Sequence, residues 1–175
     1  SGVGRTRLVF HAPTRGLIGY QGELLSDTRG TAVMNRLFHA YAPHKGEIKG
    51  RHTGVLISNG SGESVALAMW NLEDRGPMMI EVGVKVYEGM IIGEHTRGND
   101  LEVNVLKGKK LTNVRASGTD EAVRLTTPIR MTLEKALAYI QDDELVEVTP
   151  ESIRLRKVYL DPNDRKRFSR ASVDA

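Results

Sequence analysis

Residues 132–167 have the sequence TLEKALAYIQDDELVEVTPESIRLRKVYLDPNDRKR, which predicts a helix, two strands and a second helix in turn. Thr132 precedes apolar residues at helical spacing, and a threonine hydroxyl at that position caps a first turn. Apolar, β-branched segments at 145–149 and 152–158 flank Pro150 and indicate two strands joined by a turn. Asp161 followed by Pro162 is typical of the start of a short basic helix. The pattern predicts an α+β protein.

The residues upstream of this stretch predict further strands. We expect strands at 53–58, at 64–70, within 84–92 with a break at Gly89, and at 102–106. Asn59–Gly62 is a strong turn signal, so the first two strands should form a hairpin. Residues 44–175 should therefore form a β-rich, barrel-like or bent-sheet domain with one central helix and a short C-terminal helix.

The N-terminal residues predict a strand, a helix and a strand. Arg5–His11 and Thr31–Ala40 have strand character, and residues 17–28 carry apolar side chains near helical spacing between Thr14 and Gly30. Such a unit is too small to cover its own sheet, so we expect the chain to start inside a domain. An uncovered edge and apolar face predict self-association through residues 5–40, or disorder there.

Composition narrows the class of protein. The chain has 175 residues, of which 39% are hydrophobic and 27% charged, values typical of a globular rather than a disordered protein. Cysteine is absent, which excludes disulfides, thiolate nucleophiles and cysteine-ligated zinc. We find no apolar run of the ~20 residues that span a bilayer and no signal peptide, so we expect a cytoplasmic protein without a membrane partner.

Positive charge gathers in two places although the net charge is only +3. A polar segment, 107–120, carries cations that neutralise phosphates and side chains that donate to phosphate or ribose oxygens. Its candidate RNA-binding residues are Lys107, Lys109, Lys110, Thr112, Asn113, Arg115, Ser117 and Thr119, and the C-terminal run Arg165, Lys166 and Arg167 is a second candidate anchor. Composition alone is equally consistent with an ordinary basic loop exposed to solvent.

Motifs for catalysis, cofactors and metals give little signal. Residues 59–62 lack the lysine and the following helix of a P-loop, and the five histidines do not have metal-ligand spacing. Asp142–Glu144 at the end of a helix indicates a solvated turn rather than an acid–base pair. We therefore expect no catalytic, cofactor or metal residues, and a small hydrolase has the weakest support.

Four long runs resemble one protein family. FHAPTRGLIGYQGELLSDTRGTAVMNRLFHAYAP (Phe10–Pro43) resembles the second half of the fifth domain of elongation-factor-G-type GTPases, in the form carried by the BipA/TypA family. YEGMIIGEH (87–95), GKKLTNVRASGTDEAV (108–123) and DDELVEVTPESIRLRK (142–157) resemble the C-terminal domain of that family. The resemblance implies a C-terminal fragment divided into residues 1–43 and 44–175.

The resemblance also implies a fold and a function. Residues 1–43 would be part of a ferredoxin-like unit, and residues 107–121 would match the loop that contacts the acceptor end of A-site tRNA. The fragment would not be an enzyme, because GTP and magnesium belong to a GTPase domain that it lacks. The expected partners are large-subunit ribosomal RNA and A-site tRNA, in stress adaptation and large-subunit assembly. The alternative is a structural module that couples domains of its parent or binds a protein through the acidic residues 142–151.

Overall fold

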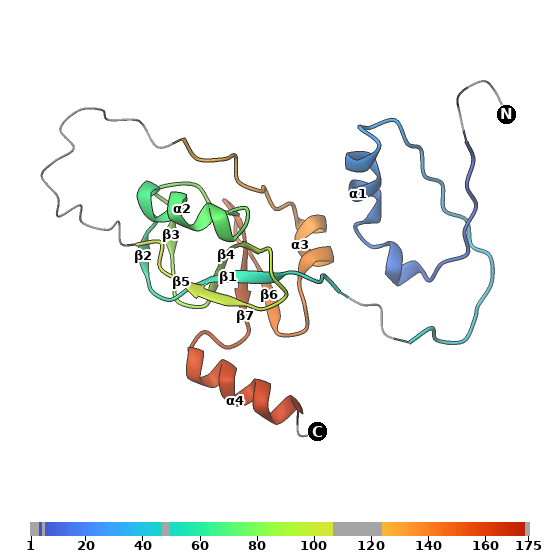
Figure 1. The fold of residues 1–175 in the computed structure, drawn as a ribbon. Coiled ribbons are helices and arrows are strands. Elements are labelled where there is room, and N and C mark those ends of the chain that lie inside the picture. Colours follow the sequence, from blue (N-terminus) through green and yellow to red (C-terminus); the bar gives the residue numbers. More distant parts are fainter. Residues whose placement is uncertain (1–3, 5, 47–49, 107–123, 174–175) are drawn as a thin grey trace, which may run out of the picture. The chain divides into compact units, whose positions relative to one another are not determined.

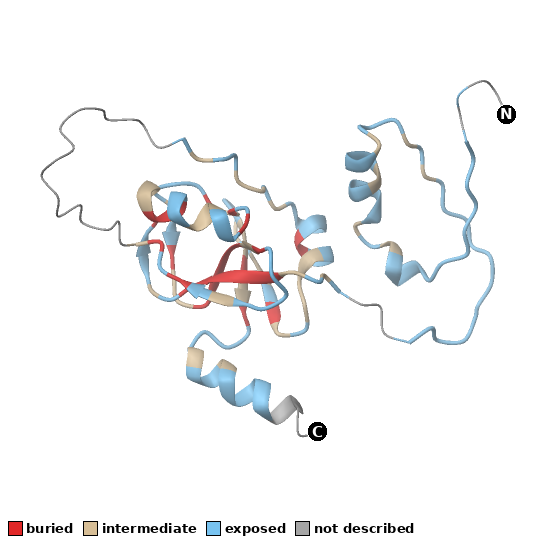
Figure 2. Cartoon of the chain, viewed as in Figure 1, coloured by how far each residue is buried: buried red, intermediate tan, exposed pale blue. Residues whose placement is uncertain are grey.

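The chain divides into two compact units, Ser1–Lys49 and Gly50–Ala175, called here the N-terminal and C-terminal units. The computed structural model describes residue 4 and residues 6–46, 50–106 and 124–173 (Figure 1). All buried residues among those described belong to the C-terminal unit, and the described N-terminal residues are exposed or half-buried (Figure 2).

A five-stranded mixed sheet forms the centre of the C-terminal unit, in the order β5-β1-β4-β7-β6 (Figure 1). β1 pairs in parallel with β5, and the other neighbours are antiparallel. The strands are β1 (Gly54–Ser58), β4 (Met90–His95), β5 (Leu101–Val103), β6 (Glu144–Val148) and β7 (Ile153–Lys157), and β2 (Gly62–Glu63) pairs with β3 (Lys85–Val86) in a separate ribbon. The helices are α2 (Ala66–Leu72), α3 (Leu133–Tyr139) and α4 (Pro162–Val173), and the 3-10 turn η2 (Glu73–Arg75) follows α2.

Both faces of the sheet are covered, because successive side chains of a strand point to opposite faces. Leu56 of β1 packs in one apolar cluster with Met69 of α2. Val55 and Ile57 pack in a second cluster with Ala136 of α3. This two-sided burial explains why β1 is a continuous apolar run rather than an alternating one.

The α+β prediction is confirmed, and the C-terminal elements lie where the sequence placed them. The Thr132 hydroxyl accepts a hydrogen bond from the Lys135 N–H at 3.2 Å, which caps α3. β6 and β7 are the two strands predicted on either side of Pro150, and they pair in antiparallel fashion. Asp161 Oδ1 accepts from the N–H groups of Asn163 and Asp164 at 2.7 and 3.2 Å, and α4 begins at Pro162.

Two predictions for the C-terminal unit are wrong. Residues 66–72 are helix α2 rather than a strand, so two helices lie among the strands instead of one. Residues 59–62 do not close a hairpin onto β1, whose partners are β4 and β5. The sequence left a barrel-like and a bent-sheet domain open, and the described strands of the unit form an open sheet. Ala, Leu and Met are strong helix formers, and a short apolar run does not distinguish a helix from a buried strand.

The N-terminal unit contains a 3-10 turn, η1 (Thr14–Leu17), and helix α1 (Tyr20–Asp27). Gly19 has a φ of +76° and separates the two, so the helix starts later than predicted. The strands predicted at 5–11 and 31–40 do not form among the described residues of this unit. An extended segment needs hydrogen-bonded neighbours, and two strands alone are marginal in water.

Candidate nucleic-acid interface

The segment predicted to bind RNA, residues 107–121, lies outside the described residues, but the structure describes the chain on either side of it, up to residue 106 and from residue 124. On the upstream side Val105 is fully buried, and its carbonyl accepts from the Val65 N–H at 2.9 Å. Leu106 packs against the same apolar cluster as Met69. The segment therefore departs from the core of the unit.

The downstream end returns to the same cluster. Leu125 packs against it, and Glu73 Oε1 accepts from the N–H and the hydroxyl of Thr126 at 2.6 and 2.8 Å. The Ile129 N–H donates to the Met78 carbonyl at 2.8 Å. Both roots are thus fixed to one rigid base, as a loop that presents functional side chains requires.

In the second predicted anchor, Arg165–Arg167, one cation is bound within the protein and two are exposed. Arg165 donates to the carbonyls of Tyr159 and Leu160 at 2.9 and 2.5 Å and pairs with Glu102 of β5 at 3.0 Å. Its guanidinium is therefore engaged in holding α4 to the sheet. Lys166 and Arg167 are exposed, and Arg167 lies only 3.6 Å from the exposed Asp164, a weak surface pair.

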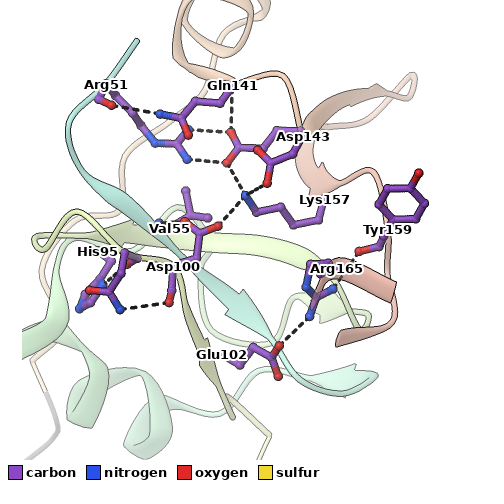
Figure 3. Close-up of polar contacts among 12 residues, drawn as sticks. Arg51, Val55, His95, Asp100, Glu102, Gln141, Asp143, Lys157, Tyr159 and Arg165 are labelled. Carbon is purple, nitrogen blue, oxygen red and sulfur yellow. Dashed lines mark hydrogen bonds and ion pairs between the residues drawn. The ribbon is translucent and has the colours of Figure 1, made fainter. Parts of the chain in front are cut away.

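A cluster of charged side chains, not predicted from the sequence, joins Arg51 near the start of the C-terminal unit to residues from later in the chain (Figure 3). Lys157 Nζ lies 2.6 Å from Asp100 Oδ2, 2.7 Å from Asp143 Oδ2 and 3.0 Å from Glu144 Oε1. Arg51 binds the Glu144 carboxylate with both Nη atoms and lies over the Tyr139 ring, 4.4 Å from its centroid. We call Arg51, Asp100, Asp143, Glu144 and Lys157 the Lys157 cluster.

The pKa values within the cluster favour the charged forms. Burial alone would raise the pKa of Glu144, but Arg51 and Lys157 outweigh it and hold this pKa below its usual value. Burial likewise opposes the charge of Lys157, yet Asp100, Asp143 and Glu144 raise its pKa. The cluster is therefore a set of ion pairs at neutral pH, and it has no unpaired acid or base to offer as a catalyst.

Comparison with known families covers both units. A model described as the TypA/BipA C-terminal domain matches residues 53–162, and one described as the elongation factor G C-terminus matches residues 1–52. The chain belongs to the TypA/BipA family. The resemblance seen in the sequence is confirmed.

Relatives of the TypA/BipA chain carry the name large ribosomal subunit assembly factor BipA. The protein of Escherichia coli (strain K12) is 57% identical over 174 residues, which are 99% of this chain and 29% of the relative. That of Haemophilus influenzae is 54% identical over 173 residues, 98% of this chain and 28% of the relative. The protein of Buchnera aphidicola is 54% identical over 167 residues, which are 95% of this chain and 27% of the relative. The chain spans less than a third of the length of these relatives.

The acidic stretch of the TypA/BipA chain is less available to a protein partner than the sequence suggested. Glu144 is buried instead of solvated, because it pairs with Arg51 and Lys157. Asp143 also pairs with Lys157, and Glu147 accepts from the Tyr87 hydroxyl at 2.5 Å. Burial, together with that hydrogen bond, raises the pKa of Tyr87 to about 12. The turn predicted at 142–144 is thus partly an internal structure.

The strand pattern held a signal for this cluster. Leu155 is buried and Lys157 is two residues further along β7, so both side chains point to the same face. Glu144 is the direct cross-strand partner of Lys157 in the β6–β7 hairpin. A lysine and a glutamate that face each other on neighbouring strands, both on the buried side of the sheet, predict a buried ion pair. Arg51 and Asp100 lie too far away in the sequence to be assigned to it.

Other kinds of site give no positive sign. Within residues 6–46, 50–106 and 124–173 no group of three or more histidine or acidic side chains is placed to hold a metal ion. Over the same residues, no helix combines the length and apolarity that a membrane crossing needs. His95 at the end of β4 is buried and its Nδ1 lies 2.5 Å from the Asn99 carbonyl oxygen, so it has a structural partner.

Proposed function

We propose that this chain is a ribosome-binding module of a translational GTPase and acts in assembly of the large subunit. The observation that carries the proposal is the match along nearly the whole chain to relatives named as large-subunit assembly factors. The module has no chemistry of its own in this proposal, and GTP with its magnesium would be bound elsewhere in the full-length protein. The cytoplasm and stress adaptation are the setting that the family resemblance suggests.

The binding element in this proposal is the segment 107–121, which contacts ribosomal RNA and the acceptor end of A-site tRNA. From residue 107 to 115 the sequence has four cations, Lys107, Lys109, Lys110 and Arg115, and no acid. Lysine and arginine bind phosphates chiefly by electrostatics and counterion release, which gives salt-dependent affinity. Thr112, Asn113, Ser117 and Thr119 would donate to phosphate and ribose oxygens, and both fixed roots support the presentation of this segment.

The test is the triple variant Lys109→Ala, Lys110→Ala and Arg115→Ala in the full-length protein. Each lost phosphate contact should lower the slope of log affinity against log salt by about one unit, so the triple variant should lose about three. Ribosome binding would be measured by pelleting or by fluorescence at several salt concentrations.

A matched control removes three exposed cations elsewhere, Lys85→Ala, Arg97→Ala and Lys135→Ala, with the same change in net charge. This control should keep the slope of the wild type. Equal slopes for the wild type and the loop variant would overturn the RNA-binding role of the segment.

A further inference from the structure

A shallow notch lies between the end of β7 and helix α4. Its volume is about 220 Å³, and its lining consists of Asp143, Tyr159, Arg165, Phe168 and Ser169. The rings of Tyr159 and Phe168 lie 5.2 Å apart between centroids at an angle of 41°. Tyr159 is 39% exposed and Phe168 47% exposed, so two adjacent aromatic surfaces are open to solvent. Figure 3 shows the Tyr159 ring turned away from the Lys157 cluster.

The frame of this notch is rigid. Arg165 ties the backbone at Tyr159 and Leu160 to Glu102 of β5. Asp161 caps the first turn of α4, which fixes the direction in which Phe168 leaves the helix. A ligand therefore meets two rings that are already in place and pays little ordering cost.

The charges of the lining are already neutralised inside the protein. Asp143 pairs with Lys157, and Arg165 pairs with Glu102. A phosphate would gain little in this notch, because the one cation is engaged and a carboxylate lies nearby. A flat ring with amino groups fits better, since it stacks on the aromatic rings and can donate to the Asp143 carboxylate.

The outward side of the same helix has the opposite character. Lys166, Arg167 and Arg170 are exposed, and their spacing of three and four residues places them on one stripe of α4. Arg165, Phe168 and Ser169 form the other stripe, which lines the notch. A chain that carries both phosphates and planar rings would engage both stripes.

We propose that this notch binds one unpaired base of single-stranded RNA, which stacks on the Phe168 ring with its edge against Tyr159, while Lys166 and Arg170 neutralise the neighbouring phosphates. The inference rests on the proposed RNA-binding function and adds a second contact, separate from the segment 107–121. Aromatic stacking tolerates every base, so the site would recognise an unpaired nucleotide rather than a sequence.

The experiment compares two probes on the 175-residue chain. One is an unstructured, fluorescent oligoribonucleotide of about ten nucleotides, a length in the range that single-strand sites cover. The other has the same backbone without bases. Phe168→Leu keeps an apolar side chain but removes the aromatic face, and it should weaken binding of the first probe about 10-fold. Binding of the abasic probe should not change.

Three further variants separate the contributions. Phe168→Tyr keeps a ring and should bind as the wild type does. Phe38→Leu removes an aromatic side chain that is 75% exposed in the other unit and should have no effect. Lys166→Ala should weaken both probes equally and reduce the salt slope by about one unit.

Two results would overturn the inference. The first is that Phe168→Leu binds the base-carrying RNA as tightly as the wild type does. A wild type that does not bind this RNA at all counts as the same result. The second is an equal loss for the abasic probe, which would mean that Phe168 supports the fold instead of a base. In either case the proposed function is tested separately, by how the affinity for ribosomes changes with salt and by whether that change depends on Lys109, Lys110 and Arg115.

Discussion

Lys157 is a cation with 1% of its surface exposed, surrounded by three carboxylates. Removing an ammonium group from water costs several kcal/mol unless its hydrogen bonds are replaced. Asp143 and Asp100 are partly solvated, whereas Glu144 is buried and is shared between Lys157 and Arg51. Among the three carboxylates, Glu144 is therefore the one whose loss deprives both buried cations of a partner.

Glu144→Gln keeps the shape of the side chain but leaves Arg51 and Lys157 short of one anion. Breaking a buried pair by removing one partner typically costs about 3–5 kcal/mol, so the urea midpoint of the C-terminal unit should fall markedly. Glu151→Gln is the matched control at an exposed position and should change the free energy of unfolding by less than about 0.5 kcal/mol. Equal midpoints for the two variants would contradict this account.

The ion pairs of Glu144 also determine how the stability of the fold changes at acidic pH. The pKa of Glu144 is lower in the folded than in the unfolded chain, so its contribution is complete above the unfolded value and is lost as the pH falls through the folded value. Wild-type stability should therefore decrease below about pH 4, where unfolded glutamates titrate. Glu144→Gln should show a weaker decrease over that range.

At the scale of elements, the turn into β4 depends on Gly89. Its φ is +84°, and a Cβ at this position would lie 2.7 Å from Leu160 Cα. Its N–H donates to the Ser58 carbonyl, and its own carbonyl accepts from the Lys157 N–H. The residue thus joins the ends of β1 and β7 through backbone contacts that leave no room for a side chain.

Gly89→Ala should therefore destabilise the C-terminal unit by more than about 1 kcal/mol, because alanine disfavours positive φ and its methyl group meets the backbone of Leu160. Thermal unfolding followed by circular dichroism gives the measurement. Gly50→Ala is the control, since its Cβ would meet only the Gln141 side chain at an ordinary 3.7 Å. A Gly89→Ala protein that melts together with the wild type would show that the backbone moves freely there.

The elements that could be predicted are those with local signals. The Thr132 cap, the turn at Pro150 and the Asp161–Pro162 pair involve neighbours in sequence, and the elements that they mark lie where expected. Helix α2 was predicted wrongly, because its type depends on packing against the sheet. The Lys157 cluster could be predicted only in part, since Arg51 lies 93 positions before Glu144 and only the tertiary fold brings them together.

At the scale of the whole molecule, the two units differ in how well they bury apolar side chains. In the N-terminal unit Phe10 is 79%, Leu37 91% and Phe38 75% exposed. No residue of α1 or η1 is buried. Exposed apolar surface beyond scattered single residues is typical of sites that contact another molecule.

We expect the isolated chain to self-associate through this surface as its concentration rises. Leu37→Glu should reduce the mass measured by sedimentation or light scattering, because a buried carboxylate opposes the contact. Val148→Glu introduces the same charge at a position 60% exposed in the C-terminal unit and should leave the association unchanged. A wild-type protein that remains monomeric at high concentration would contradict the expectation.

The position of Arg51 has a mechanical consequence. Arg51 is the second residue of the C-terminal unit, and its guanidinium binds the Tyr139 carbonyl and Glu144, while its own carbonyl accepts from Gln141 at 3.0 Å. If the backbone is pulled at Gly50, the contacts of Arg51 would therefore transmit the force to the α3–β6 connection before the force reached β1. Strand β1 would bear the tension only after the Arg51 contacts had broken, so forced unfolding should begin with the rupture of those contacts.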